Sequence, residues 1–405
     1  MLYFFIYLFL GFGGIYYYKN FSRNSYKGVH LIAFLIFVYI AGMRYNLGVD
    51  YFTYAKSFVE TDTLADLFGY RSYAEFKESH HWEPGFECLC VLLRTISSDP
   101  QILFLASSVI CSVFLFKAID YFAEKRFVLL SLLTYFCSAY LLQEMQALRQ
   151  ALAASIIYFS LVKLMQNRNR ACFFYILLAA SFHSSALIFL PIAWGLKKKF
   201  SFRRQIAVLS AALAVFFLKI KWLGGIISIS ASLLPQMGVV EQLYKYISNE
   251  ELGLQRGVFA TFFLYLLVYC LFLYKNRHHG YYEEDPKLTV AQNLLFYFLV
   301  ITASTWEISF ISMRLSWFFL FGLAICLPYM ITFFKPSSRP LAFVYVLFFN
   351  FLLVRPFIFP TVVTKPFAPY QDYISCVYFG EKSTGKERAE TYAAEMGVKV
   401  IFETE

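Results

Sequence analysis

Residues 101–126 read QILFLASSVICSVFLFKAIDYFAEKR, an apolar run that ends in a basic segment. An α-helix needs about 20 mostly apolar residues to cross the hydrocarbon core of a membrane, and runs of this kind recur along the chain. Of the 405 residues, 59% are apolar and only 15% are charged, whereas soluble proteins are about a quarter charged. The sequence therefore predicts an all-α, polytopic integral membrane protein without a soluble catalytic domain.

The chain carries a net charge of +10, from 36 basic and 26 acidic residues. In a polytopic membrane protein such an excess usually records basic cytoplasmic loops, so we expect no nucleic-acid partner. Placing every strongly basic short loop on the cytoplasmic side predicts about ten crossings, with the N-terminus outside. The expected crossings are residues 1–18, 29–43, 101–116, 127–142, 151–165, 205–220, 257–274, 290–303, 310–334 and 341–359.

One apolar stretch does not fit a simple crossing. Arg170 and Lys197 both begin basic runs, and too few residues lie between them for two full spans. Two half-length helices, 171–181 and 185–196, can meet at His183, each arm reaching ~17 Å into a core of ~30 Å. The sequence therefore predicts a re-entrant hairpin over residues 171–196, which is tolerated only where it is buried in protein or lines a wet cavity.

Three further segments are polar. We expect an external loop at residues 44–100, an external segment at 221–256, and a polar C-terminal tail at 360–405, after a transmembrane domain at 1–359. The chain has no P-loop, no dinucleotide-binding glycine pattern and no zinc signature, so we expect neither a cofactor nor a metal. It also has no convincing internal repeat, which weighs against the repeat-built transporters.

Ionisable residues in or beside the apolar runs indicate where a site lies. A charge inside a membrane helix costs ~2.5–3.5 kcal/mol on insertion scales, so it usually has a function or a partner. Arg149 opens a helix whose N-terminal end is already positive, which makes sense if an anion occupies that position. The predicted topology gathers such residues at the outer face: Arg44, Asp50, Glu83, Glu87, Glu144, Arg149, Arg256, Glu307 and Arg314, with His183 at the hairpin tip.

Other readings stay open for several of these residues. Arg44 follows a span directly and could simply extend its charge toward the interface. Glu307 and Arg314 lie two helical turns apart, so a structural ion pair is as good an interpretation as a function. His183 could be a packing residue, although its titration range suits proton transfer. We expect Glu83 and Pro84 to start a short interfacial helix, with Pro84 at its first position.

The polar motifs, taken in order, resemble those of the EpsG family of exopolysaccharide polymerases, which are relatives of the Wzy-type O-antigen and capsule polymerases. The resemblance spans roughly residues 1–335, and one departure is Trp317, where a Tyr is expected. The motifs are RYNLGVDY at 44–51 with Tyr54, EPGFE at 83–87, LRQALA at 148–153, HSSA at 183–186, and Arg314 followed by Trp317 and Phe318.

The resemblance implies a glycosyltransferase of the bacterial inner membrane with the all-helical architecture of the lipid-dependent (GT-C-like) enzymes. Its substrate would be an oligosaccharide repeat unit on undecaprenyl diphosphate at the periplasmic or exterior face. The product would be exopolysaccharide, capsule or O-antigen, and a chain-length regulator and a flippase are candidate partners besides the lipid bilayer.

The residue chemistry agrees with such a reaction. Arg side chains suit a diphosphate leaving group because their forked donors make paired hydrogen bonds, and they remove the need for a metal. The acceptor hydroxyl needs a base. The candidates are Arg149, Arg314, Arg44 and Arg256 for the diphosphate, His183, Asp50 and Glu83 for catalysis, and Gln150, Glu144, Glu307 and Tyr54 as further site residues.

Two other classes of function stay open. A transporter or flippase should carry polar residues through both halves of the membrane. An acyltransferase that modifies glycans should bring acyl-donor residues to the cytoplasmic side as well. The predicted polar residues favour one face, which argues for the polymerase.

Overall fold

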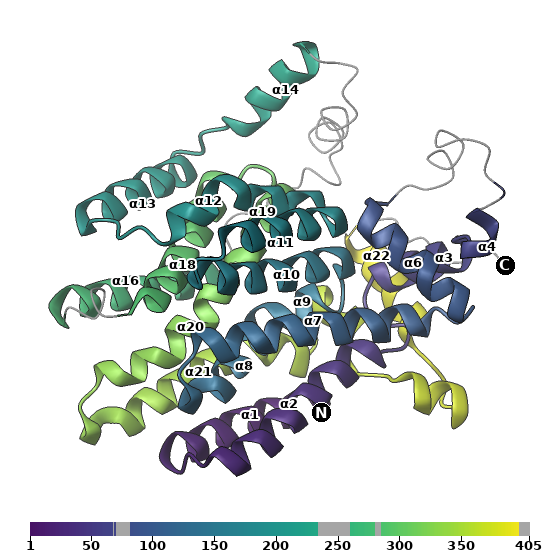
Figure 1. Cartoon of the computed structure of the whole chain (residues 1–405), viewed down its shortest axis with the longest axis horizontal. Coiled ribbons are helices and arrows are strands. Elements are labelled where there is room, and N and C mark those ends of the chain that lie inside the picture. The colour runs from purple at the N-terminus through teal and green to yellow at the C-terminus, as the bar shows by residue number, and fades with distance from the viewer. Residues whose placement is uncertain (68, 70–81, 234–259, 280–284, 397–405) are drawn as a thin grey trace. The chain divides into compact units, whose positions relative to one another are not determined.

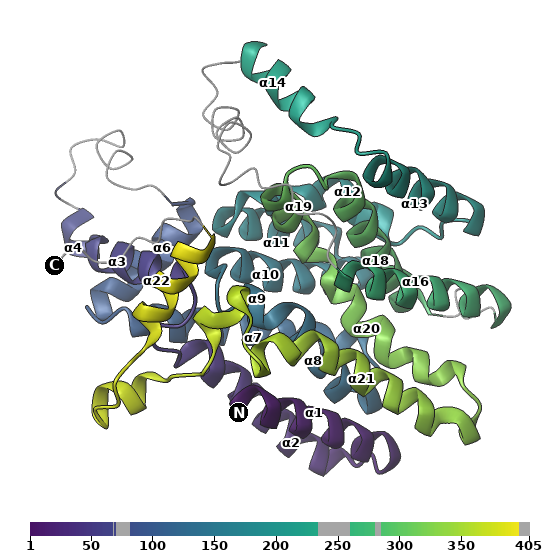
Figure 2. The same cartoon turned by 180° about the vertical axis from the view of Figure 1, so that it is seen from behind.

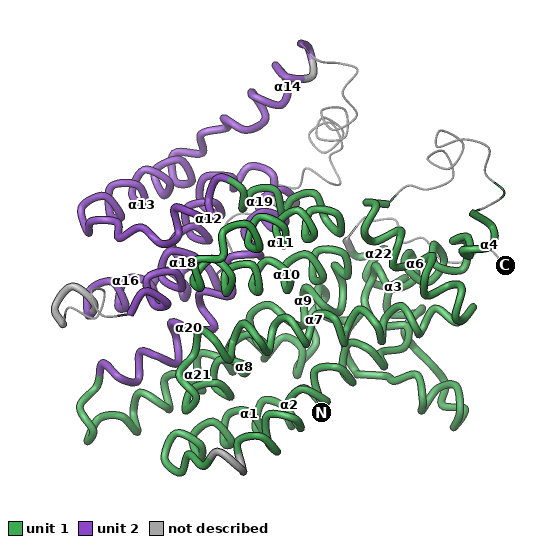
Figure 3. The backbone as a smooth tube through the Cα atoms, viewed as in Figure 1, with its two compact units in different colours: residues 1–190, 334–405 green, residues 191–333 purple. Residues whose placement is uncertain are grey.

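The computed structural model describes residues 1–67, 69, 82–233, 260–279 and 285–396 (Figure 1). Within these residues every regular element is helical, and the one β-bridge joins Arg44 to Asp372. The chain divides into two compact units, unit 1 with residues 1–190 and 334–405 and unit 2 with residues 191–333 (Figure 3).

The described helices include six that are long and apolar enough to cross a membrane, which makes the chain a multi-pass membrane protein. Shorter apolar helices cover Tyr26–Gly42, Asn169–Phe182, Ser184–Leu196 and Ala260–Lys275. The expected number of ten crossings stays a prediction. The six spans are Gln101–Phe122, Lys125–Gln143, Leu148–Met165, Pro286–Ser304, Ile311–Phe333 and Pro336–Ile358.

Unit 1 holds most of the helices that the polar motifs flank. Its N-terminal elements are α1 (Leu2–Lys19), α2 (Arg23–Gly42), α3 (Asp50–Glu60), α4 (Leu64–Leu67), α6 (Pro84–Ile96), α7 (Gln101–Phe122), η1 (Lys125–Phe127), α8 (Val128–Tyr135), η2 (Phe136–Tyr140), α9 (Leu141–Gln143), α10 (Leu148–Met165), α11 (Asn169–Phe182) and η3 (Ser184–Ile188). Its C-terminal elements are η6 (Pro336–Ser338), α21 (Arg339–Ile358), η7 (Val362–Phe367), η8 (Ile374–Tyr378) and α22 (Gly385–Met396).

Small residues let the helices of unit 1 approach closely, as packing between membrane helices requires. A Cβ atom on Gly11 would lie 2.9 Å from Leu347 of α21, and one on Gly14 would lie 2.7 Å from Leu130 of α8. Helix α10 packs against both α7 and α11, and its alanines are fully buried there (Figure 1, Figure 2). This packing fixes the position of the first turn of α10, which carries Arg149.

The polar motifs of unit 1 lie at one end of its helices. Helix α2 ends there, α7 and α10 begin there, and α11 ends there, because α7, α8 and α10 run in alternating directions. We call this the site end. The expected break at His183 is present, since α11 ends at Phe182 and η3 begins at Ser184.

The C-terminal tail packs back against the site end of unit 1. The N–H of Tyr45 donates to the carbonyl of Gln371 (3.0 Å), and the N–H of Gly48 donates to Pro366 (3.0 Å). Gly48 has φ +90°, and a Cβ atom there would lie 2.5 Å from the carbonyl oxygen of Met145, so only glycine fits. The tail therefore holds the loop between α2 and α3 in place.

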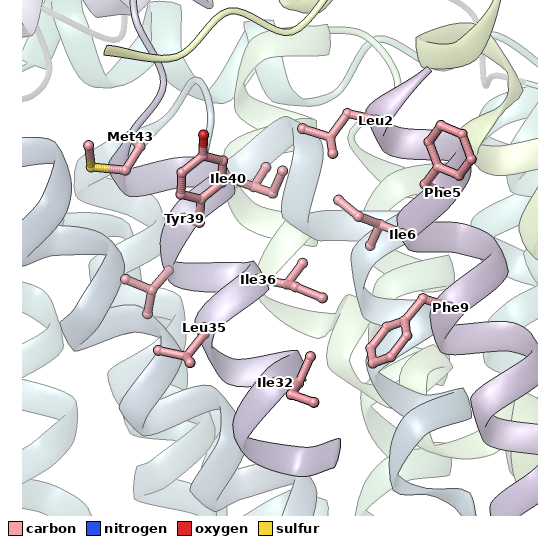
Figure 4. A pocket seen from close by; sticks show the side chains of 11 residues that line it. Leu2, Phe5, Ile6, Phe9, Ile32, Leu35, Ile36, Tyr39, Ile40 and Met43 are labelled. Carbon is pink, nitrogen blue, oxygen red and sulfur yellow. The ribbon is translucent and has the colours of Figure 1, made fainter. Parts of the chain in front are cut away.

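An apolar pocket of about 680 Å³ lies between α1 and α2 (Figure 4). The first turns of α1 supply one wall and the second half of α2 supplies the other. Its lining is Leu2, Phe5, Ile6, Phe9, Ile32, Leu35, Ile36, Val38, Tyr39, Ile40 and Met43.

Unit 2 is organised around α18, which packs against α13, α16, α19 and α20. The amide of Asn293 on α18 donates to the carbonyls of Leu196 (2.7 Å) and Lys198 (2.9 Å). Its elements are α12 (Phe189–Leu196, which begins in unit 1), α13 (Phe202–Phe217), α14 (Leu223–Leu233), α16 (Ala260–His279), α18 (Pro286–Ser304), α19 (Ser309–Ser316), η4 (Trp317–Leu320), α20 (Phe321–Tyr329) and η5 (Met330–Phe333).

Candidate active site

Glu83 precedes the short helix α6 as its N-cap residue, and Pro84 occupies the first helical position, as the sequence predicts. Proline fits there because its missing N–H would have no partner within the helix. The backbone of Glu83 is extended, with φ −63° and ψ 144°. Its side chain leaves the helix start and reaches Arg149 and His183, two of the other candidates.

Arg149 lies in the first turn of α10, and its guanidinium forms an ion pair with Glu83 Oε2. The guanidinium carbon also lies 4.1 Å from the centre of the Trp82 ring, and the side chain is hydrogen-bonded to Tyr54. A carboxylate, an aromatic face and a hydroxyl therefore hold this cation at the positive end of a helix.

His183 lies in the extended residue that separates α11 from η3. Its Nδ1 is 3.1 Å from Glu83 Oε1, which also accepts the backbone N–H of Ser184 at 3.4 Å. Glu83 thus uses one oxygen for Arg149 and the other for the His183 segment. The three side chains are 19%, 18% and 12% exposed for Glu83, Arg149 and His183, so the cluster is partly open.

The charge state of Glu83 follows from these neighbours. Burial raises the pKa of the carboxyl, but the hydrogen bond from His183 and the charge of Arg149 lower the pKa more, to about 2. Glu83 is therefore an anion at neutral pH and can only accept hydrogen bonds. His183 must then carry a proton on Nδ1, which leaves Nε2, an atom that is buried in this structure, as the nitrogen that can take a further proton.

This arrangement suits general-base chemistry. A carboxylate that holds Nδ1–H fixes the tautomer and orientation of an imidazole and stabilises its cation, as in carboxylate–histidine pairs of nucleophilic enzymes. Arg149 places a guanidinium, which is always positive, next to that imidazole. Together they can deprotonate a hydroxyl and bind an anionic leaving group.

Trp82 is a site residue that the sequence analysis did not select. Its ring faces the Arg149 guanidinium, and its centre is 5.8 Å from that of Tyr54 and 6.0 Å from that of Phe86. Its position directly before Glu83 was the available signal. The packing partners belong to α3, α6 and α10, so the contact depends on the fold.

Arg44 and Glu144 are near each other but away from the solvent. Arg44 is 0% exposed, and its Nη1 donates to the carbonyls of Ala41 (2.7 Å) and Glu144 (2.9 Å). Its guanidinium carbon lies 4.6 Å from the centre of the Phe104 ring. This burial leaves Arg44 no surface to offer a diphosphate.

The other candidates lie on elements of both units. Asp50 is the first residue of α3, and Gln150 is fully buried in α10. In unit 2, Glu307 Oε2 accepts the N–H groups of Leu223 (3.1 Å) and Gly224 (3.2 Å) at the start of α14. Arg314 lies on α19 of the same unit.

One predicted position, Arg256, is outside the described residues. In the part of the chain that the structure describes, no three His, Cys, Asp or Glu side chains gather as a metal site would require. The cluster of Glu83, Arg149 and His183, supported by Tyr54 and Trp82, is the candidate active site.

The sequence model of one protein family, described as the EpsG family, matches residues 27–371 of the chain. The match extends past the region of the predicted resemblance into the first part of the C-terminal tail. No curated protein and no solved structure matches the chain.

Proposed function

This chain belongs to the EpsG family, and we propose that it is a polysaccharide polymerase that joins lipid-diphosphate-linked oligosaccharide units. The observation that carries the proposal is the contact between Glu83, Arg149 and His183 at the end of the membrane helices of unit 1. A carboxylate-held imidazole beside a fixed guanidinium supplies a base for a sugar hydroxyl and a cation for a diphosphate.

In the proposed reaction, His183 Nε2 takes the proton of the acceptor hydroxyl as its oxygen forms a bond to the anomeric carbon of the donor. The bond from that carbon to the diphosphate oxygen breaks, and its electron pair leaves with the diphosphate. Glu83 holds Nδ1–H and stabilises the imidazolium that forms. Arg149 and the N-terminal end of α10 stabilise the charge on the leaving group.

Arg149 can serve both Glu83 and the donor because a guanidinium has five N–H donors. Of the other arginines in the sequence prediction, Arg44 is fully buried, so we do not include it in this role. Arg314 remains a candidate for the diphosphate. The proposal includes undecaprenyl diphosphate as the carrier, ten crossings with a GT-C-like arrangement, and a site end that faces the exterior of the inner membrane.

The test is glycan analysis of a host that lacks this gene and carries the wild-type chain or Arg149→Ala. We expect the null host and the variant to accumulate single lipid-linked repeat units and to make no long polymer. Lys163→Ala is the matched control, because Lys163 lies on the last turn of the same helix. Wild-type polymer from Arg149→Ala would overturn the role of Arg149, and normal polymer in the null host would overturn the polymerase.

A further inference from the structure

The polar C-terminal tail carries an exposed apolar surface. Ile374, Val377 and Tyr378 belong to η8, and Phe379 follows directly after it. Tyr378 is 74% exposed and Phe379 is 78% exposed, although both are aromatic. We call these four residues the apolar tip. Such a cluster of exposed apolar side chains indicates a surface that contacts another apolar phase.

The base of the apolar tip is held rigidly. The carboxylate of Asp372 accepts the N–H of Ser375 (3.0 Å) and its hydroxyl (2.9 Å). The N–H of Tyr373 donates to the carbonyl of Met43 (2.8 Å), and the Tyr373 hydroxyl donates to the carboxylate of Asp99. These bonds attach the segment that carries the apolar tip to the residues next to α2 and α7.

These anchor points place the apolar tip at the boundary of the membrane helices. Met43 follows the last residue of α2, and Asp99 precedes α7, one of the six candidate spans. The Tyr370 hydroxyl donates to the carbonyl of Tyr39, which lies one turn inside α2 (3.2 Å). In Figure 1 the yellow segment lies at the site end, beside the N-terminus of α1.

The segment that carries the apolar tip is bonded to residues of an apolar surface on α2. Tyr39 and Met43, to which the tail is bonded, also line the apolar pocket between α1 and α2 (Figure 4). Along α2 the side chains of Leu31 and Leu35 are exposed as well. The residues that follow the tip, Glu381 and Lys382, are charged and suit the aqueous side of the interface.

We propose that the apolar tip is a membrane-interface anchor that inserts into the boundary between lipid headgroups and acyl chains at the site end. Aromatic side chains are favoured at this depth because the interface accepts both their ring and a polar end. The partner is a lipid surface, and the proposal does not depend on the polymerase activity. The anchor would tie the loop between α2 and α3, and through it Tyr54, to the level of the bilayer.

The test uses the full-length chain with a polarity-sensitive fluorescent amino acid, encoded genetically, at position 379. The protein is reconstituted in vesicles of phosphatidylethanolamine and phosphatidylglycerol, with bromine atoms near the carbonyl end of the acyl chains. The control is the same label at Lys382, whose side chain is 85% exposed on the same segment. We expect the bromolipid to quench the label at 379 several-fold more than the label at 382.

No quenching at 379 would overturn the proposal, because the apolar tip would then lie in water or against a protein. Equal quenching at both positions would overturn it as well. A second measurement does not depend on the label. In vesicles, Tyr378→Glu combined with Phe379→Glu should speed hydrogen exchange at the amides of Tyr45 and Tyr373 relative to wild type. Unchanged exchange at these amides would also count against an anchor.

Discussion

Two pairs of an arginine and a glutamate in unit 1 differ in their access to solvent. Glu83 and Arg149 are partly exposed and form a direct ion pair, whereas Arg44 and Glu144 are buried, and Arg44 reaches only the backbone carbonyl of Glu144. Both Glu144 carboxyl oxygens are buried and have no hydrogen-bond partner among the residues that the structure describes. Charged residues near membrane helices can therefore serve structure or chemistry, and their exposure distinguishes the two roles.

The pKa values of the two carboxyls differ in the same way. His183 and Arg149 hold the pKa of Glu83 at about 2 in spite of its burial. Burial raises the pKa of Glu144 to about 8, and the charge of Arg44 compensates only in part. At neutral pH, Glu83 is thus a carboxylate that can orient a histidine, and Glu144 is mainly a neutral acid.

The largest expected effect is a loss of polymerisation activity that occurs when the open cluster is changed and not when Glu144 is changed. We expect His183→Ala to lower the polymerisation rate by about 10²–10⁴-fold, the usual contribution of a general base. Glu144→Gln should polymerise at the wild-type rate per folded molecule, because Glu144 is away from the open cluster. The measurement is polymer formation from lipid-linked repeat units in vesicles. A His183→Ala rate equal to wild type would contradict the assignment.

The next largest expected effect is on the stability of the fold, which should differ between variants of Arg44 and Arg149. Arg44→Ala takes the side-chain donor away from the buried carbonyls of Ala41 and Glu144 and should destabilise the fold by about 1–3 kcal/mol for each group left unsatisfied. Arg149→Ala removes a partly exposed side chain and should cost far less. Thermal unfolding of both variants in the same detergent compares them. A smaller loss for Arg44→Ala than for Arg149→Ala would reverse our interpretation of the two arginines.

Glu144 should make stability fall as the pH rises. Its folded-state pKa of about 8 lies above its ordinary value of 4.5, so the folded state binds more protons between these values. The contribution is complete below about pH 4.5 and is lost as the pH rises toward 8. Thermal unfolding across this window should show the decline in the wild type and a flatter profile in Glu144→Gln. Parallel profiles would contradict it.

Glu83 should have the opposite effect, so that stability falls as the pH falls. Its pKa is lowered from 4.5 to about 2, so the unfolded state binds more protons in that window. Its contribution is complete above about pH 4.5 and is lost as the pH falls toward 2. Comparing the wild type with Glu83→Gln at acidic pH should show the steeper loss in the wild type. Equal slopes would mean that Glu83 is not paired in the folded protein.

The smallest effect should come from Trp82. A cation–π contact contributes about 0.5–2 kcal/mol, so Trp82→Leu should lower the rate several-fold by releasing Arg149. Trp82→Phe keeps an aromatic face and should recover part of the rate. The same vesicle assay measures both variants. A Trp82→Phe rate no better than that of Trp82→Leu would indicate packing alone.

Much of the helical framework was predictable because its causes are local. The start of α6 at Pro84 follows from the geometry of proline, and the break at His183 follows from the distance between two basic runs. The burial of Arg44 was not predictable, because the packing of the tail and of Phe104 around it is not visible in its own segment.

The sequence by itself determined that this protein is a helical membrane protein of the EpsG family, because hydropathy, helix length and motif order are properties of the chain. Only the tertiary structure decided which charged residues meet. Glu83 is 66 residues from Arg149 and 100 residues from His183, and it reaches both because α6, α10 and α11 present these residues at one end of unit 1. The side chains of that cluster are partly exposed, whereas Arg44 and Glu144 are buried. The sequence does not show this difference, because exposure depends on which other segments cover a residue.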